Sequence, residues 1–237
     1  MLDFSAIEFG IPFFLRGLVA TAVFCAIATV VGLVFGTVVA LGRMSKRKFL
    51  RGLSIAFIEP FRNTPFLVQA FLIYFGLAQI GIGLSATVAG LIILSLFSAA
   101  MFAEGIRGGI LAVPKGQLEA ARAVGIPYFT AMRRIVFPQS IGYLIPVITN
   151  LTIGLIKESA ALSVISVHEL TMAGQIVVGE TFRPAESYIA IALLYWLLTA
   201  AVVRGFLGLQ RHLRHRHSSA VRVQRAGESS LATQQFK

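Results

Sequence analysis

Residues 14–41 read FLRGLVATAVFCAIATVVGLVFGTVVAL, an apolar run in which Arg16 is the only charged residue. An α-helix needs about 20 such residues to cross a hydrocarbon core of about 30 Å. A spanning helix also satisfies its backbone hydrogen bonds internally, which lipid requires. This run therefore predicts a membrane-spanning helix and indicates an all-α integral membrane fold.

Four further runs have the same character, at residues 54–77, 84–103, 145–167 and 188–207. The second contains Arg62, and the fourth contains Lys157 and Glu158. The composition agrees, with 57% hydrophobic residues, 13% charged residues and a mean hydropathy of +0.82, whereas soluble domains carry about 25% charged residues. We expect five transmembrane helices in one domain, residues 1–209.

The basic residues orient the chain, because cytoplasmic loops are enriched in Lys and Arg. Of the 21 Lys and Arg residues, 17 lie after the first or third run or at the end of the chain from Arg204 onward, and Arg183 is the clear loop cation on the other side. This pattern predicts an outside N-terminus and a cytoplasmic C-terminus. The clusters lack the aromatic interleaving of a nucleic-acid groove, so no nucleic-acid partner is expected.

Residues 210–237 form a basic tail that we expect to be cytoplasmic and disordered. His212, His215 and His217 lie there, and we assign them to the basic membrane-proximal segment rather than to a metal site. The chain has no CxxC pair and no HExxH motif, so no metal site is expected. The outer segment, residues 168–187, is expected to form a small helix.

Residues 105–143 form the longest predicted cytoplasmic segment between spans. Residues 117–124 are good helix formers, and Gly125 and Pro127 end the run. A second short helix is expected from about Thr130 to near Pro138. The segment is either a solvated loop or a docking element for a cytoplasmic partner.

The spacing of Glu119-Ala120-Ala121, Gly125, Ile135 and Pro138 resembles the EAA loop of ABC-importer permeases, with Phe137 where that family usually has Leu. Four other stretches are similar to the polar-amino-acid branch of the family: RNTPFLVQ (62–69), AEGIRGG (103–109), VPKGQ (113–117) and KESAAL (157–162). The last departs from the Lys-Asp-Thr-Ser-Leu that is common in that branch. The resemblance covers residues 12–208.

The resemblance implies a subunit of the bacterial cytoplasmic membrane that pairs with a second permease, identical or a sister chain. ATPase subunits would bind ATP and magnesium below it, and a solute-binding protein would dock outside. Glu119, Ala120, Ala121 and Gly125 would form the ATPase-coupling element. The chain has no GxxxxGK[ST] motif, so we expect no ATPase site or cofactor of its own. The implied cargo is a polar amino acid, an opine or another small polar solute, and lipid surrounds the spans.

Charges at membrane depth are functional candidates by default. Glu158 is our candidate for meeting the α-ammonium group of the substrate, with Lys157 anchored to another helix or loop. Ser159, with Ser163 and Ser166, is expected to form a polar stripe beside Glu158; alternatively, the serines bond back to helix carbonyls.

Two other groups complete the candidate residues. Glu104 and Arg107 are three residues apart, so they can form a structural ion pair on one helix face. Arg62 and Thr64 are placed with the candidate substrate pathway. Arg62 could hold a substrate carboxylate, pair with an acid, or extend to the cytoplasmic surface.

Two rival functions predict different features. A secondary transporter driven by an ion gradient usually has more spans and internal repeats, and it has no need of the segment from Glu119 to Pro138. A membrane enzyme would need a cluster of His, Asp or Glu residues, which the sequence lacks. ATP dependence separates the first rival from an importer, and product formation would reveal the second.

Overall fold

The computed structural model describes residues 5–234, and every regular element in that range is helical. In chain order the elements are α1 (Ser5–Arg43), α2 (Lys48–Asn63), α3 (Phe66–Phe71), the π-helical turn η1 (Leu72–Gly76), α4 (Leu77–Gln79), α5 (Ala86–Leu111), α6 (Lys115–Ala123), α7 (Tyr128–Ala131), the π-helical turn η2 (Met132–Val136), α8 (Phe137–Glu158), the 3₁₀ segment η3 (Ser159–Ile165), α9 (Leu170–Thr181) and α10 (Pro184–Gln234).

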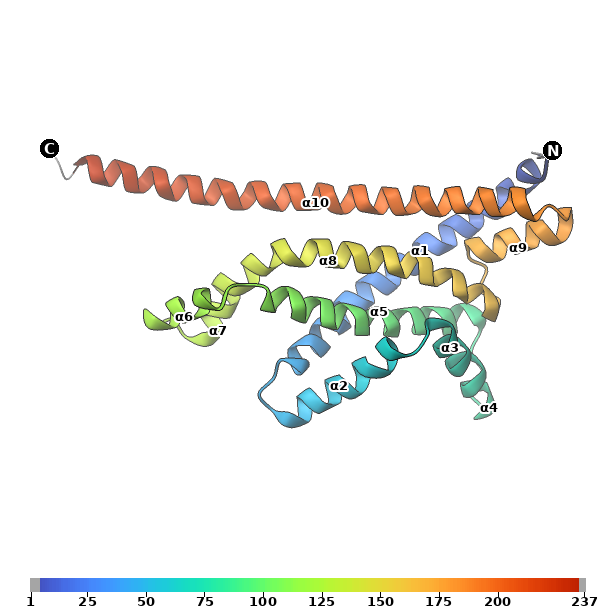
Figure 1. The fold of residues 1–237 in the computed structure, drawn as a ribbon, viewed down its shortest axis with the longest axis horizontal. Coiled ribbons are helices and arrows are strands. Elements are labelled where there is room, and N and C mark those ends of the chain that lie inside the picture. The colour runs from blue at the N-terminus through green and yellow to red at the C-terminus, as the bar shows by residue number, and fades with distance from the viewer. Residues whose placement is uncertain (1–4, 235–237) are drawn as a thin grey trace.

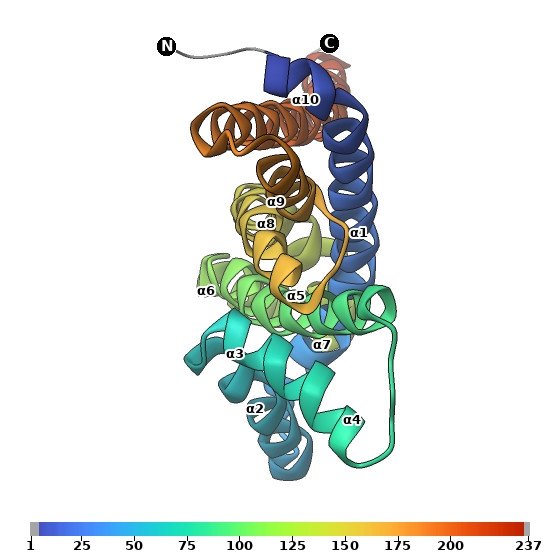
Figure 2. The same ribbon diagram turned by 90° about the vertical axis from the view of Figure 1, so that its right-hand side faces the viewer.

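The long helices α1, α5, α8 and α10 extend along the longest axis of the molecule, and α1 crosses the others obliquely (Figure 1). The short helices α6 and α7 project at one end, while α4 and α9 lie at the other (Figure 1). Viewed from that other end, α1 lies on one flank, with α10 and the α2–α4 region at opposite extremes (Figure 2). The fold therefore has two distinct ends joined by a helical bundle.

Four helical stretches are long and apolar enough to cross a membrane: Ala6–Arg43, Ala86–Leu111, Tyr128–Ile165 and Pro184–His212. They correspond to the first, third, fourth and fifth predicted runs. The second run differs because it is interrupted by a break between α2 and α3, and its apolar part, Phe66–Gln79, is shorter.

Proline explains that break. Pro65 has no N–H to donate, and it disfavours a helical conformation at the residue before it. Thr64 accordingly has φ −120° and ψ 149°, which is extended backbone. The second predicted run is thus divided into two helical parts on either side of Thr64-Pro65, and the fifth spanning helix stays a prediction.

Pro138 does not end a helix, contrary to our expectation. The chain runs from α7 through η2 into α8, with Pro138 in the first turn of α8. The hydrogen bonds of a π-helical turn differ from those of a regular α-helix. Pro138 follows such a turn, so its missing N–H does not interrupt a regular series of α-helical hydrogen bonds. The candidate span consequently begins earlier, at Tyr128.

The last helix, α10, extends to Gln234. Residues 210–234 contain no proline, which would interrupt a helix. Residues 235–237 lie outside the described residues, and the cytoplasmic, disordered character of the tail stays a prediction. A small helix expected within residues 168–187 is present as α9, and its outer location also stays a prediction.

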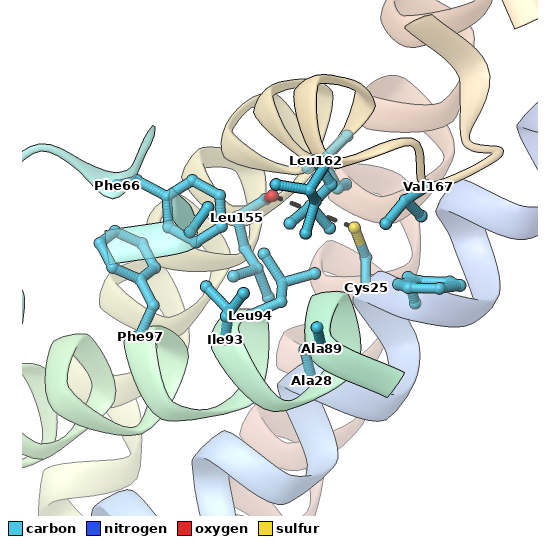
Figure 3. Close-up of a cluster of buried hydrophobic side chains, with 14 residues drawn as sticks. Cys25, Ala28, Phe66, Ala89, Ile93, Leu94, Phe97, Leu155, Leu162 and Val167 are labelled. Carbon is cyan, nitrogen blue, oxygen red and sulfur yellow. Dashed lines mark hydrogen bonds between the residues drawn. The ribbon is translucent and has the colours of Figure 1, made fainter. Parts of the chain in front are cut away.

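Small residues allow α1 and α5 to pack closely. A Cβ atom added to Gly36 would lie 2.8 Å from the carbonyl oxygen of Ala99, and one added to Gly32 would overlap Ser98. Gly32 and Gly36 are four residues apart, the spacing that lets membrane helices approach each other. The buried cluster in Figure 3 continues this contact, with Ala28 and Cys25 of α1 beside Ala89 and Ile93 of α5.

Candidate functional site

The candidate coupling segment is a helix ended by a glycine turn. Gly125 has φ +79°, a left-handed conformation that suits a residue without a Cβ atom. The N–H of Gly125 donates to the carbonyl of Arg122, and the N–H of Ile126 donates to that of Ala121, both at 3.0 Å. These two bonds form a Schellman motif, so the sharp turn expected at Gly125 is confirmed.

One side of α6 is exposed, and the other side packs against the helical bundle. Glu119 and Ala120 are exposed, whereas Ala121 is buried at 4% exposure. Beyond the turn, Val124 and Phe129 are 76% and 75% exposed. The end of the molecule formed by α6 and α7 therefore presents an acidic side chain beside bare apolar side chains, which is the mixed character of a protein interface.

The buried side of α6 connects this end to the bundle. Leu118 packs against a core cluster that includes Val113, Val136 and Ile106, and Gln139 of α8 donates to Gln117 at 3.3 Å. A displacement of α6 would therefore act directly on α5 and α8.

Glu158, the candidate for meeting the substrate, lies at the end of α8. It lines a cavity of about 170 Å³ between α5 and α8, together with Asn150, Ser98 and apolar neighbours. This volume is below the roughly 300 Å³ of a typical small-molecule site. Among residues 6–212, whose side chains the structure describes, none forms an ion pair with Glu158 or Lys157, and the anchor expected for Lys157 is not found there.

The serines near Glu158 bond to their own backbone. Ser159 is fully buried and donates to the carbonyl of Ile156 at 2.7 Å, and Ser163 donates to that of Ala160 at 2.8 Å. The expected stripe assumed 3.6 residues per turn, but residues 159–165 form a tighter 3₁₀ helix and Ser166 is left-handed with φ 64°. The three serines therefore do not share one α-helical face.

Glu104 contacts three arginines from three elements. Arg107 Nη2 lies 2.8 Å from Glu104 Oε2, which is the contact predicted by their spacing. Arg43 Nε at the end of α1 lies 3.4 Å from Oε1, and Arg62 Nη1 of α2 lies 3.6 Å from Oε2. Of the alternatives for Arg62, this chain shows pairing with an acid. The cluster joins α1, α2 and α5 and leaves an excess of positive charge.

Thr64 takes part in the proline break. Its hydroxyl donates to the carbonyl of Pro60 at 2.7 Å. Gln69, 6% exposed, donates its side-chain amide to the carbonyls of Phe61 and Thr64 at 3.0 and 2.9 Å. These bonds satisfy carbonyls at the break, including that of Phe61, which Pro65 cannot reach as a donor.

A buried acid on the other end of the molecule was not predicted. Glu169 is fully buried, and its carboxylate accepts from the N–H groups of Thr171 and Met172 at 2.9 and 2.8 Å, which caps α9. The hydroxyl of Tyr195 in α10 donates to it at 2.7 Å. Burial raises the pKa of the Glu169 carboxyl above its usual value of 4.5, although these hydrogen bonds oppose the shift.

A bundle with four helical stretches of membrane-spanning length is the architecture of an integral membrane protein. The sequence profile of the family described as "Binding-protein-dependent transport system inner membrane component" matches residues 32–215. The chain belongs to this family of bacterial inner-membrane transport components.

Individual proteins that are similar in sequence are also named as permeases of transport systems. The Bacillus subtilis protein named "Probable amino-acid ABC transporter permease protein YckA" is 40% identical over 83% of this chain and 88% of its own length. The arginine transport system permease protein ArtQ of Bacillus subtilis is 36% identical over 87% and 94% of the two chains. The nopaline transport system permease protein NocM of Agrobacterium fabrum is 35% identical over 86% and 88%.

Solved structures share the fold. An amino acid ABC transporter crystallised with histidines contains a chain that is 38% identical, with a TM-score of 0.85 over 90% of this chain and 99% of that one. An inward-facing structure of the MetNI methionine ABC transporter gives a TM-score of 0.71 at 21% identity, over 86% and 97% of the two chains. The protein is thus the permease component of an amino-acid ABC importer.

Proposed function

We propose that this permease moves a polar amino acid, or a related small polar solute such as an opine, inward by alternating access driven by a separate ATPase. The observation that carries the proposal is the projecting α6, with Glu119 and Ala120 exposed and Ala121 and Leu118 anchored in the bundle. ATPase closure would push on this helix and so shift α5 and α8. ATP and magnesium would bind to the ATPase subunits, and a solute-binding protein would deliver the cargo from outside.

The substrate pathway is proposed to pass Glu158. Its cavity is small, and its carboxylate has no cationic partner in the described part of the chain. A second permease, identical or a sister chain, would enlarge this site and bring its own groups to it. The carboxylate would then face the α-ammonium group that all the candidate amino acids share. Lys157, Arg62, Thr64 and Ser159 remain secondary candidates, because in this chain Arg62, Thr64 and Ser159 serve the internal contacts described above.

A pull-down from gently solubilised membranes tests the coupling. The native chain should recover an ATPase subunit, and Glu119→Lys should lose it, because the substitution reverses the charge on the exposed face of α6. Glu180→Lys makes the same charge change on an exposed residue of α9 and should keep the ATPase. An intact native chain without any ATPase partner would contradict the importer proposal. Recovery with both variants would remove Glu119 as a necessary contact.

Glu158→Gln tests the pathway separately. We expect ATP-driven uptake to fall at least tenfold, the effect of about 1.4 kcal/mol lost from binding of the ammonium group. ATPase recovery in the pull-down should remain unchanged. Normal uptake by a fully assembled complex would show that the ammonium is recognised elsewhere.

A further inference from the structure

The turn between α1 and α2 concentrates positive charge. Lys46, Arg47, Lys48 and Arg51 are all exposed, and Arg43 lies just before them. The sequence contains no Asp or Glu between Glu8 and Glu59. The nearby Glu104 offers one carboxylate to three arginines, so it does not neutralise the region. This end of α1 therefore carries a local charge that favours an anionic ligand.

Exposed apolar side chains adjoin these cations. Phe49 is 79% exposed and Leu53 is 60% exposed, and their spacing of four residues places them on one face of α2. Ser54 and Ile58 are buried on the opposite side. The first turns of α2 are thus held to the bundle by one face, and Phe49 and Leu53 are exposed on the other, next to the exposed cations Lys46, Arg47 and Lys48 at the start of the helix. Arg51 is seven residues before Ile58 and is exposed on the bundle side.

The position of the α1–α2 turn indicates that lipid headgroups surround it. It directly follows the spanning stretch Ala6–Arg43 and lies toward the same end of the molecule as α6 and α7 (Figure 1). A basic amphipathic segment at the end of a span lies at the depth of lipid headgroups, with its apolar side chains toward the acyl chains.

We propose that this surface, residues 46–53, binds an anionic phospholipid of the phosphatidylglycerol type. Lys46, Arg47 and Lys48 meet the headgroup phosphate, and Phe49 and Leu53 contact the acyl chains. A phospholipid supplies both the anion and the apolar part, whereas free phosphate supplies only the anion. The proposal depends on the insertion of α1 in the membrane and not on coupling to an ATPase.

Fluorescence quenching by brominated lipids can test this on the isolated chain in phosphatidylcholine vesicles. Trp196 is the only tryptophan, so Trp196→Phe gives a background in which Phe49→Trp reports on the proposed site. We expect brominated phosphatidylglycerol to quench this tryptophan several-fold more effectively than brominated phosphatidylcholine. Phe75→Trp, half exposed in η1, is the control; the sequence has no Lys or Arg between Arg62 and Arg107, so both lipids should quench it equally.

Charge variants complete the test. Lys46→Gln with Lys48→Gln should lower the relative affinity for phosphatidylglycerol at position 49, by about fivefold for each cation removed. Arg222→Gln with Arg225→Gln removes the same charge from the tail and should leave that affinity unchanged. Equal quenching by the two lipids at position 49, or equal effects of the loop and tail variants, would overturn the proposal. Displacement of the lipid by inorganic phosphate would also overturn it, in favour of a free-anion site. Because no transport is measured, these outcomes are independent of the importer proposal.

Discussion

Gly125 sets the direction in which the chain leaves α6. Its left-handed conformation costs an L-residue about 1–2 kcal/mol, so Gly125→Ala should lower the free energy of unfolding by about that amount. Gly116→Ala is a matched control, because Gly116 lies within α6 and has open space around it. There alanine should be neutral or stabilising by up to about 1 kcal/mol.

Thermal unfolding of the detergent-purified variants provides the comparison. The assembled transporter should also hydrolyse ATP with weaker dependence on substrate in Gly125→Ala, because the angle of the docking helix has changed. Equal stability of the Gly125 and Gly116 variants would contradict the role given to the positive φ angle.

Glu169 makes stability depend on pH. Its folded-state pKa lies above 4.5, so the folded protein binds this proton more tightly than the unfolded chain does. The resulting stabilisation is fully present below pH 4.5 and is lost as the pH rises through the folded-state pKa. We therefore expect the melting temperature to fall with rising pH over that window.

Glu169→Gln should flatten this part of the pH profile, while Glu180→Gln, at an exposed position of the same helix, should leave it intact. His168 and Arg16 line the same cavity as Glu169. The comparison should therefore be repeated in a His168→Asn background, which removes the neighbouring imidazole. A slope that survives Glu169→Gln would contradict its assignment to Glu169.

At the scale of elements, the contact between α1 and α5 depends on glycines, which have no side chain. The Cβ atom of a valine at Gly36 would lie 2.8 Å from the backbone oxygen of Ala99, which cannot rotate away. Gly36→Val should therefore destabilise the fold by about 1–3 kcal/mol through overpacking. Gly205→Val in α10 meets no atom within 4 Å and is the control.

Unfolding temperatures of the two variants in the same detergent should differ by several degrees. If Gly36→Val unfolded at the temperature of Gly205→Val, the close approach of α1 and α5 would not be a determinant of stability.

Hydropathy was sufficient to predict most of the helices, but the irregular segments needed information from other parts of the chain. Pro65 divides the second predicted run, whereas Pro138 lies inside the spanning stretch Tyr128–Ile165. An extended residue precedes Pro65, and an irregular helical turn precedes Pro138. Local sequence does not separate these outcomes. The tight 3₁₀ helix that redirects Ser163 and Ser166 was also invisible to a pattern counted at 3.6 residues per turn.

In the candidate site, too, contacts within one helix could be predicted from the sequence, whereas contacts between elements could not. The spacing of Glu104 and Arg107 predicted their contact, since both lie on one helix. Arg43 and Arg62 reach the same carboxylate only after three elements pack together. Tyr195 and Glu169 are 26 residues apart; an acid just before a helix start, a capping signal, was the one local clue to Glu169.

For the whole molecule, its two ends have different chemistry. The exposed helix α6 and the basic α1–α2 turn both lie toward one end, and at the other end α9 is capped by a buried acid (Figure 1). An importer coupled to a cytoplasmic ATPase requires the first end to face the cytoplasm. The excess of Lys and Arg at that end predicts the same orientation independently.

Cysteine labelling can test this orientation, because Cys25 is the only cysteine and is buried. In a Cys25→Ser background, Glu180→Cys places a thiol on α9 and Lys46→Cys places one at the α1–α2 turn; both positions are exposed. A membrane-impermeant maleimide should label position 180 in intact cells and position 46 only after permeabilisation. The reverse pattern would place α6 outside the cell, where it could not meet an ATPase, and would refute the coupling mechanism together with the orientation.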